Sequence, residues 1–228
     1  MKTAKNLFPF IIVSGLHLIA LAMSIEMLSM VSKPLIILSL LHYFNKSVID
    51  TPISKLVIFA LGCSLIGDIA LMFQSENEIL FMVGLGFFLL AHIGYAFINF
   101  NLVNDDQRKI KLYWQDIPLI IIGFGVFLLI KDGLGNLQIP VLSYIVIISF
   151  MAITARQRYN RSDNESFWLI MAGALFFILS DTLLAMNKFL GPIENERILI
   201  MSTYVIAQFL IVKGIIVFIQ KIRPEAGS

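Results

Sequence analysis

Long apolar stretches follow one another along the whole chain, each bounded by a short polar connection. Within each stretch the apolar residues are continuous, which argues against membrane-spanning strands, because these alternate in polarity. A membrane-spanning helix needs about 20 mostly apolar residues. The pattern therefore predicts an all-α polytopic membrane protein with eight transmembrane helices. The predicted spans lie near residues 8–26, 28–44, 54–73, 79–102, 114–130, 138–156, 166–187 and 197–219.

Composition supports the membrane assignment and narrows the partners. Hydrophobic residues make up 58% of the chain and charged residues 14%, whereas soluble domains carry about 25% charged residues. No basic cluster interleaved with aromatic residues suggests nucleic acid as a partner, so the expected surroundings are membrane lipids. The one cysteine, Cys63, lies inside an apolar stretch and is interpreted as a small packing residue.

The basic residues are unevenly shared between the connections. Cytoplasmic connections of membrane proteins hold the excess of Lys and Arg. Three basic residues, Lys131, Lys188 and Arg197, lie in the even-numbered connections. Twelve lie at the termini and in the alternate connections: Lys2, Lys5, Lys46, Lys55, Arg108, Lys109, Lys111, Arg156, Arg158, Arg161, Lys221 and Arg223. This alternation predicts that both the N-terminus and the C-terminus are cytoplasmic. Because the apolar stretches do not alternate in polarity as those of an outer-membrane barrel do, we expect an inner or plasma-type membrane.

A short internal similarity bears on domain organisation. Residues 64–72 resemble residues 177–185, because each segment has a small residue before an aspartate and a leucine three residues after it. Two organisations of a single integral membrane domain over 1–228 stay open. One is an undivided bundle, and the other is a pair of repeat halves, 1–112 and 113–228. Four helices per half would make such repeats parallel rather than inverted.

Two acids lie inside predicted spans, Asp68 in the third and Asp181 in the seventh. A charged carboxylate at the centre of a membrane helix costs about 2.5–3.5 kcal/mol or more. Both acids lie past the middle of spans that run outward, so they should have similar depth. One interpretation is a catalytic carboxyl pair, in which mutual repulsion leaves one group neutral and the other charged. The alternative is that each acid separately bonds a neighbouring helix or pairs with a lysine.

Further polar side chains inside the spans are candidates for binding a substrate. Lys33 could hold a phosphate, neutralise one aspartate, or extend to the membrane surface. His92 could orient a substrate, relay a proton, or be a satisfied interior histidine. Tyr204 and Gln208 are one turn apart and share a helix face, and Tyr95 adds another hydroxyl. No spacing of His or Cys residues indicates a metal site.

The order of these motifs resembles the YhhN-like lysoplasmalogenase family over nearly the whole chain. The motifs are Lys33-Pro34-Leu35, Gly67-Asp68-x-x-Leu71-Met72, Ala91-His92-x-x-Tyr95, Ser180-Asp181-x-x-Leu184-Ala185 and Tyr204-x-x-Ala207-Gln208. The resemblance implies an eight-helix hydrolase that cleaves the vinyl ether bond of lysoplasmalogens. The products would be a fatty aldehyde and glycerophosphocholine or glycerophosphoethanolamine. It also implies that Asp68 and Asp181 are catalytic and that the substrate is a lysophospholipid.

The chemistry of a vinyl ether agrees with a carboxyl pair. Protonation of the outer alkene carbon gives an oxocarbenium ion, which water then attacks. A neutral carboxylic acid supplies the proton, and a carboxylate stabilises the cation and activates the water, as in glycoside hydrolysis. This reaction requires no cofactor. Lys33 is then a candidate for the phosphate, and His92 and Tyr95 are candidates for orientation.

Two other functions compete with this interpretation. An intramembrane aspartyl protease also uses two membrane aspartates, in Gly-x-Gly-Asp and Tyr-Asp motifs. Here Leu65 stands at the position of the first glycine and Ser180 at that of the tyrosine. A proton-coupled membrane transporter of a lipid or small solute would also use paired membrane acids. Turnover in detergent distinguishes a hydrolase from a carrier, because a carrier needs a sealed compartment.

Overall fold

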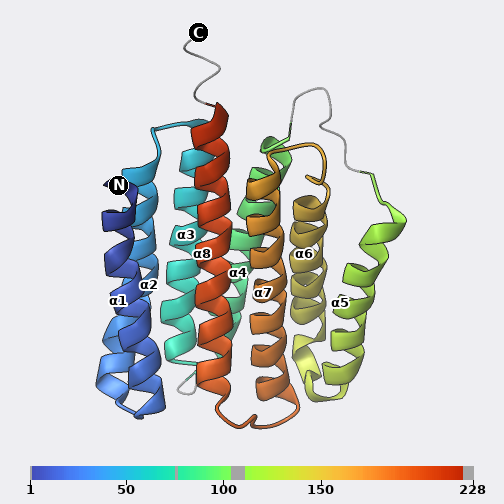
Figure 1. Ribbon diagram of the computed structural model, residues 1–228. Coiled ribbons are helices and arrows are strands. Elements are labelled where there is room, and N and C mark those ends of the chain that lie inside the picture. Colours follow the sequence, from blue (N-terminus) through green and yellow to red (C-terminus); the bar gives the residue numbers. More distant parts are fainter. Residues whose placement is uncertain (1, 75–76, 104–110, 223–228) are drawn as a thin grey trace. The chain divides into compact units, whose positions relative to one another are not determined.

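The computed structural model describes residues 2–74, 77–103 and 111–222, and this part of the chain contains eight α-helices and no strand (Figure 1). The all-α prediction is therefore confirmed. The basic residues Arg108, Lys109 and Arg223 lie outside the described residues. The helices are α1 (Lys2–Ala22), α2 (Glu26–Ser47), α3 (Pro52–Met72), α4 (Glu78–Asn101), α5 (Ile117–Ile130), α6 (Gln138–Arg156), α7 (Asn164–Phe189) and α8 (Glu196–Ile222).

Within the described residues, seven helices are long and apolar enough to cross a membrane. This result supports a polytopic membrane protein. Local signals explain where several of the helices begin. At α3, Thr51 just before Pro52 and Ser54 in the first turn form a reciprocal capping box, which satisfies donors that a helix start leaves unpaired. At α7, the Asp163 side chain accepts a hydrogen bond from the backbone N–H of Ser166 at 2.9 Å.

The fifth helix is shorter than predicted. The apolar run near 114–130 predicted a full span, but α5 has 14 residues, about 21 Å of helix against about 30 Å of hydrocarbon. Short 3₁₀ turns flank it at Trp114–Asp116 and Lys131–Gly133. Gly133 adjoins the end of α7 so closely that a Cβ there would lie 2.2 Å from the carbonyl oxygen of Phe189. The helix thus ends at Ile130, three residues before the chain comes into tight contact with α7 at Gly133.

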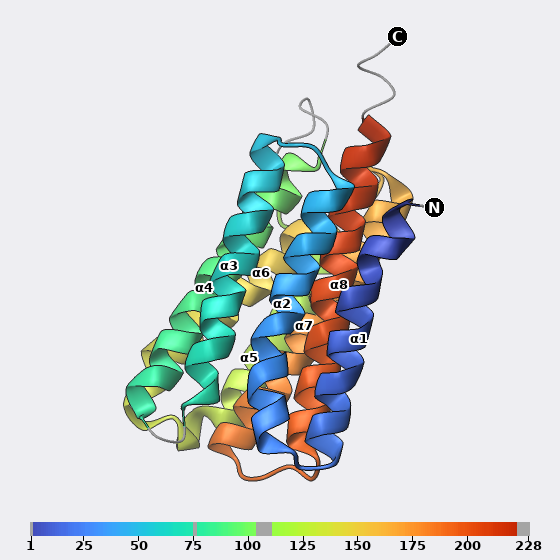
Figure 2. The same ribbon diagram turned by 90° about the vertical axis from the view of Figure 1, so that its left-hand side faces the viewer.

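Contacts divide the chain into two compact units, with divisions inside α4 and α8. Unit 1 comprises residues up to Tyr95 together with those from Ile216 onward, and unit 2 comprises Ala96–Ile215. In unit 1, α1 packs along α2 and α2 along α3, as Figures 1 and 2 both show. The last part of α8 joins this unit through Gln220, whose side-chain N–H donates to the carbonyl oxygen of Ser47 at 3.0 Å.

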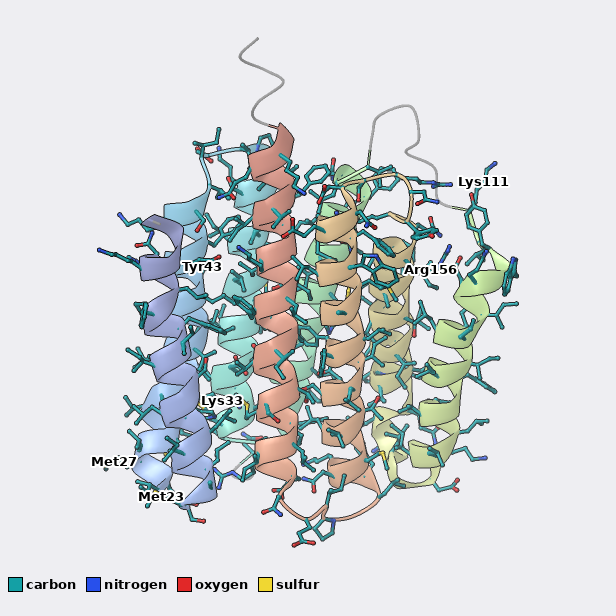
Figure 3. All side chains as sticks on the ribbon, viewed as in Figure 1. Met23, Met27, Lys33, Tyr43, Lys111 and Arg156 are labelled. Carbon is teal, nitrogen blue, oxygen red and sulfur yellow. The ribbon has the colours of Figure 1, made fainter. Side chains whose placement is uncertain are left out.

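In unit 2, α6 packs against both α5 and α7. Arginines of the α6–α7 connection join these elements at the end of the unit where Figure 3 labels Arg156 and Lys111. Arg156 pairs with the buried Asp116, and Arg161 donates to the Tyr113 hydroxyl at 2.7 Å. The sequence placed these two arginines in a connection, and the structure shows that both are half-buried. Through Asp116 and Tyr113, these arginines anchor the segment before α5.

Arg158 is fully buried in the same connection, and its guanidinium donates to the Ser166 hydroxyl at 2.6 Å. Burial lowers the pKa of Arg158 to about 9, and the nearby Asp163 carboxylate acts in the opposite direction. The guanidinium therefore stays charged at neutral pH. A buried charge is tolerated only where partners replace its hydration, and the first turn of α7 supplies that partner here.

Close helix contacts in unit 2 depend on glycine. A Cβ at Gly173 of α7 would lie 2.9 Å from the backbone nitrogen of Ile211 and 3.0 Å from the carbonyl oxygen of Ala207 in α8. A Cβ at Gly214 of α8 would lie 3.0 Å from the carbonyl oxygen of Ser166. Small residues let helix backbones approach closely in membranes. This contact fixes α8 against α7, on which Asp181 lies.

Candidate active site

In unit 1, the predicted site residues Lys33 and Asp68 lie together. The Nζ atom of Lys33 on α2 is 3.9 Å from Oδ1 of Asp68 on α3. The exposed fractions of the two side chains are 17% and 4%, so the pair is largely removed from solvent. Figure 3 shows Lys33 partway along α2, between Met27 near one end of that helix and Tyr43 toward the other. The observed contact matches one of the roles predicted for Lys33, that of neutralising an aspartate.

The position of Asp68 depends on the glycine before it. A Cβ at Gly67 would lie 2.8 Å from the ring of Phe88 and 3.3 Å from the carbonyl oxygen of Gly84, both on α4. A Cβ at Gly84 would meet Leu71 of α3 at 2.7 Å. The two glycines therefore let α3 and α4 approach closely at the turn that carries Asp68.

A second polar contact lies next to Lys33 in sequence. His17 of α1 is buried, and its Nδ1 atom is 2.9 Å from the Ser32 hydroxyl of α2. Both side chains are buried, so this contact packs α1 against α2. In the sequence, the signal for this contact was the pair Ser29 and Ser32, one helical turn apart, because small polar residues bond neighbouring membrane helices.

His92 and Tyr95 lie on α4 within unit 1, with exposed fractions of 0% and 1%. Gly67 contacts Gly84, and Gly94 contacts Ala60, whose Cβ would be 3.2 Å from a Cβ added at Gly94. This antiparallel register places His92 near the level of Leu61, about 10 Å along the helix axis from Asp68. Both side chains lie nearer the middle of the helices than Asp68. Their role in orienting a substrate stays a prediction.

In unit 2, Asp181 has a partner that the sequence interpretation missed. The Tyr144 hydroxyl of α6 donates a hydrogen bond to Oδ2 of Asp181 on α7. Tyr144 is buried, whereas Asp181 is half-buried. A buried tyrosine hydroxyl needs a hydrogen-bonding partner, so a tyrosine inside the sixth apolar stretch was the signal that could have identified it.

Tyr204 and Gln208 of α8 are both buried, and the amide of Gln208 donates to the Tyr204 hydroxyl at 3.2 Å. The prediction that they share one helix face is confirmed. Phe177, one turn before Asp181, meets Tyr204 edge-on with ring centroids 5.6 Å apart. The Ser180 hydroxyl also donates to the carbonyl oxygen of Ile200 at 3.1 Å. These contacts bring Tyr204 to within about two turns of Asp181 along α7.

The two acids belong to different units, and their cooperation stays a prediction. Unit 1 contains a carboxyl beside an ammonium, Asp68 with Lys33. Unit 2 contains a carboxyl beside a phenol, Asp181 with Tyr144. Among the described residues, no three His, Cys, Asp or Glu side chains gather as a metal site would require. A carboxyl beside an ammonium and a carboxyl beside a phenol can each take part in proton transfer and electrostatic stabilisation.

Comparison with known proteins agrees with the resemblance found from the motifs. The model of the YhhN family matches residues 28–215. The chain belongs to the YhhN family. That match includes all seven predicted site residues. No solved structure matches this YhhN-family chain.

Curated relatives of this YhhN-family chain are named lysoplasmalogenases. The Homo sapiens protein named lysoplasmalogenase TMEM86A is 31% identical over 163 residues, covering 70% of this chain and 65% of that protein. Lysoplasmalogenase TMEM86B of Homo sapiens is 30% identical over 67% of this chain and 59% of its own length. The Mycobacterium bovis lysoplasmalogenase is 29% identical over 59% of this chain and 50% of its own. The matched region thus spans about half to two thirds of these relatives.

Replacing Gly67 with alanine tests how Asp68 is positioned. The added Cβ collides with Phe88 and approaches the Gly84 carbonyl, so α3 must move away from α4. We expect Gly67→Ala to lower the free energy of unfolding by about 1–3 kcal/mol, as overpacking does. Thermal melting of the purified protein in detergent measures the change. Gly62→Ala is the matched control, because a Cβ at that position of α3 has nothing within 4 Å. Equal melting of the two variants would exclude a tight α3–α4 contact at Gly67.

Proposed function

We propose that the protein is a membrane lipid hydrolase that cleaves the vinyl ether bond of lysoplasmalogens. The products are a fatty aldehyde and glycerophosphocholine or glycerophosphoethanolamine. Asp68 and Asp181 act as general acid and general base. The observation that carries the proposal is the Lys33–Asp68 pair, a cation and a carboxyl only 3.9 Å apart within membrane-spanning helices. Relatives named lysoplasmalogenases in a mammal and in a bacterium support the same activity.

The proposed reaction assigns one step to each carboxyl. One aspartic acid delivers its proton to the outer alkene carbon, and the alkene electron pair forms the new C–H bond. The positive charge then lies on the carbon and oxygen of the ether, and in this proposal the carboxylate of the other aspartate stabilises it. That carboxylate removes a proton from water as the water oxygen attacks the cation. The hemiacetal then loses its hydroxyl proton to the aspartate that gave up the first proton, and its C–O bond to the glycerol oxygen breaks to leave the aldehyde. The departing glycerol oxygen takes the proton that the other aspartate removed from water, so both carboxyls return to their starting states.

The positions of the acids along their helices suit an amphiphilic substrate. Asp68 lies four residues before the end of α3, and Asp181 lies eight residues before the end of α7. With both termini cytoplasmic, as the charges predict, α3 and α7 run in the same direction and both acids lie toward the outer face. The head group of a lysophospholipid would stay near that face while its alkenyl tail lies between helices.

Lys33 is the proposed phosphate ligand of this site. Its ammonium carries three donors, and its distance of 3.9 Å from Asp68 exceeds that of a direct hydrogen bond. Three donors allow one ammonium to contact a carboxylate and a phosphate oxygen at once. His92, Tyr95, Tyr204 and Gln208 are the proposed groups for orienting the glycerol and the chain.

Aldehyde release by purified protein in detergent, from choline and ethanolamine lysoplasmalogens, tests the proposed activity. The wild type should release aldehyde. Asp68→Asn and Asp181→Asn keep the side-chain size but remove the acid and the base, so each should lower kcat by about 10²-fold or more. Asp132→Asn is the control, because Asp132 is exposed at the α5–α6 connection.

Two outcomes would contradict the proposed activity. The first is full turnover by folded Asp68→Asn or Asp181→Asn protein, with melting curves that match the wild type. The second is a wild type that releases no aldehyde in detergent but moves a lipid or solute across sealed vesicles. That result would establish the proton-coupled carrier instead.

Lys33→Met tests the proposed phosphate contact. Methionine preserves most of the apolar length of the side chain but removes the charge. A hydrogen bond to a charged group contributes about 1.5–3 kcal/mol, so KM for the lysophospholipid should rise roughly tenfold or more, with a smaller loss of kcat. Lys213→Met is the control, because Lys213 is a half-buried membrane lysine of α8 outside the proposed site. Kinetics identical to the wild type would remove Lys33 from the site.

A further inference from the structure

The two acids differ in the chemistry of the partner that each one contacts. Asp68 lies beside the ammonium of Lys33, whereas Asp181 accepts a hydrogen bond from the neutral hydroxyl of Tyr144. A cation attracts the charged form of a carboxyl, whereas a hydroxyl can donate to either form. A mechanism that needs one proton donor and one carboxylate therefore has two unlike candidates.

The structure holds Asp181 by contacts with two neighbouring helices. Tyr144 approaches from α6, and its buried ring lies six residues after that helix begins. The Ser180 hydroxyl, adjacent in sequence, bonds the backbone of α8 at Ile200. Phe177, on the preceding turn, packs edge-on against Tyr204. The turn that carries Asp181 is thus fixed, while the carboxyl is half-buried rather than sealed away.

We propose that Asp181 is the proton donor of the reaction and that Tyr144 is the residue that positions it, with Asp68 as the carboxylate beside Lys33. This proposal rests on the proposed hydrolysis. Tyr144 occupies Oδ2 of Asp181, which directs the transferred proton to Oδ1. The hydrogen bond thereby restricts the rotation of the carboxyl.

Tyr144 also favours the transition state over the bound substrate. As the proton moves from Asp181 to the outer alkene carbon, the electron pair of the O–H bond stays on the carboxyl, which becomes a carboxylate. A donated hydrogen bond strengthens as that negative charge develops. Interactions that are stronger in the transition state than in the ground state accelerate the chemical step. The Tyr144 hydroxyl should therefore act on kcat rather than on substrate binding.

Tyr144→Phe tests this assignment, because it removes the hydroxyl and preserves the ring. Loss of one preorganised donor to a developing anion typically lowers kcat by about 10²–10³-fold. We expect kcat to fall about 10²-fold with KM within about twofold of the wild type. Tyr43→Phe is the matched control, since Tyr43 is a buried tyrosine of α2 outside the proposed site. Its kinetics should equal those of the wild type.

The solvent deuterium isotope effect on kcat identifies the step. If Asp181 protonates carbon, slowing that step by Tyr144→Phe leaves an isotope effect as large as that of the wild type or larger. A smaller isotope effect in the variant would show that Tyr144 assists a later step, and would overturn the assignment of Asp181 as proton donor. A kcat within about threefold of the wild type would overturn the positioning role of Tyr144.

A second variant keeps the test decisive if Tyr144→Phe does not fold. Difluorotyrosine at position 144 preserves the ring and the hydroxyl but ionises at lower pH than tyrosine. Turnover should fall as this phenol ionises, because a phenolate cannot donate to Asp181; unchanged turnover would contradict the proposal. A wild type that releases no aldehyde would refute the proposed hydrolysis itself, whereas an active wild type with an equally active variant would refute only this inference.

Discussion

A carboxyl group among apolar helices must find its partner on another helix, because no water replaces its hydration there. The helix that carries the acid has its own backbone groups already bonded, so the partner is a side chain from a neighbour. Asp68 of α3 meets this requirement with Lys33 of α2, and Asp181 of α7 meets it with Tyr144 of α6. Each acid therefore joins its helix to the preceding helix of the same unit.

The same requirement limits how the helices can rotate. Apolar side chains pack similarly against lipid or against another apolar helix, so they distinguish poorly between rotations. A polar contact is directional, and the close glycine contacts of Gly67 with α4 and of Gly173 with α8 set the distances between backbones. Together these features hold both acids rigidly, as general acid–base chemistry requires. In the proposed hydrolysis, the acids are kept in the membrane despite their free-energy cost because the reaction needs them.

Much of the fold could be predicted from the sequence, since long apolar runs define membrane helices almost by themselves. The sixth helix begins and ends at the predicted residues, and α7 extends the predicted span by two residues at each end. The fifth was predicted too long, because apolar composition does not reveal the 3₁₀ turns at Trp114–Asp116 and Lys131–Gly133. The burial of Arg158 was equally hidden, since basic residues in a connection usually face water.

The candidate site was only partly predictable. An acid inside an apolar run is conspicuous, so Asp68 and Asp181 could be found from the sequence alone. Its partner is harder to find, because it lies on a different helix at a separation that depends on rotation and register. Lys33 was recognised through its own charge, and its contact with Asp68 was one of several alternatives. Tyr144 was missed because a tyrosine in a membrane helix is common and carries no charge.

Isotope labelling of the products tests the central claim, that the protein protonates a vinyl ether carbon and adds water to the resulting cation. Hydrolysis of a lysoplasmalogen in D₂O, with immediate reduction of the aldehyde, should place one deuterium on the carbon next to the former carbonyl. A parallel reaction in ¹⁸O-labelled water should leave the glycerophospho product unlabelled, because the bond broken is on the alkenyl side of the ether oxygen. An aldehyde without deuterium, or ¹⁸O in the glycerol product, would contradict the account.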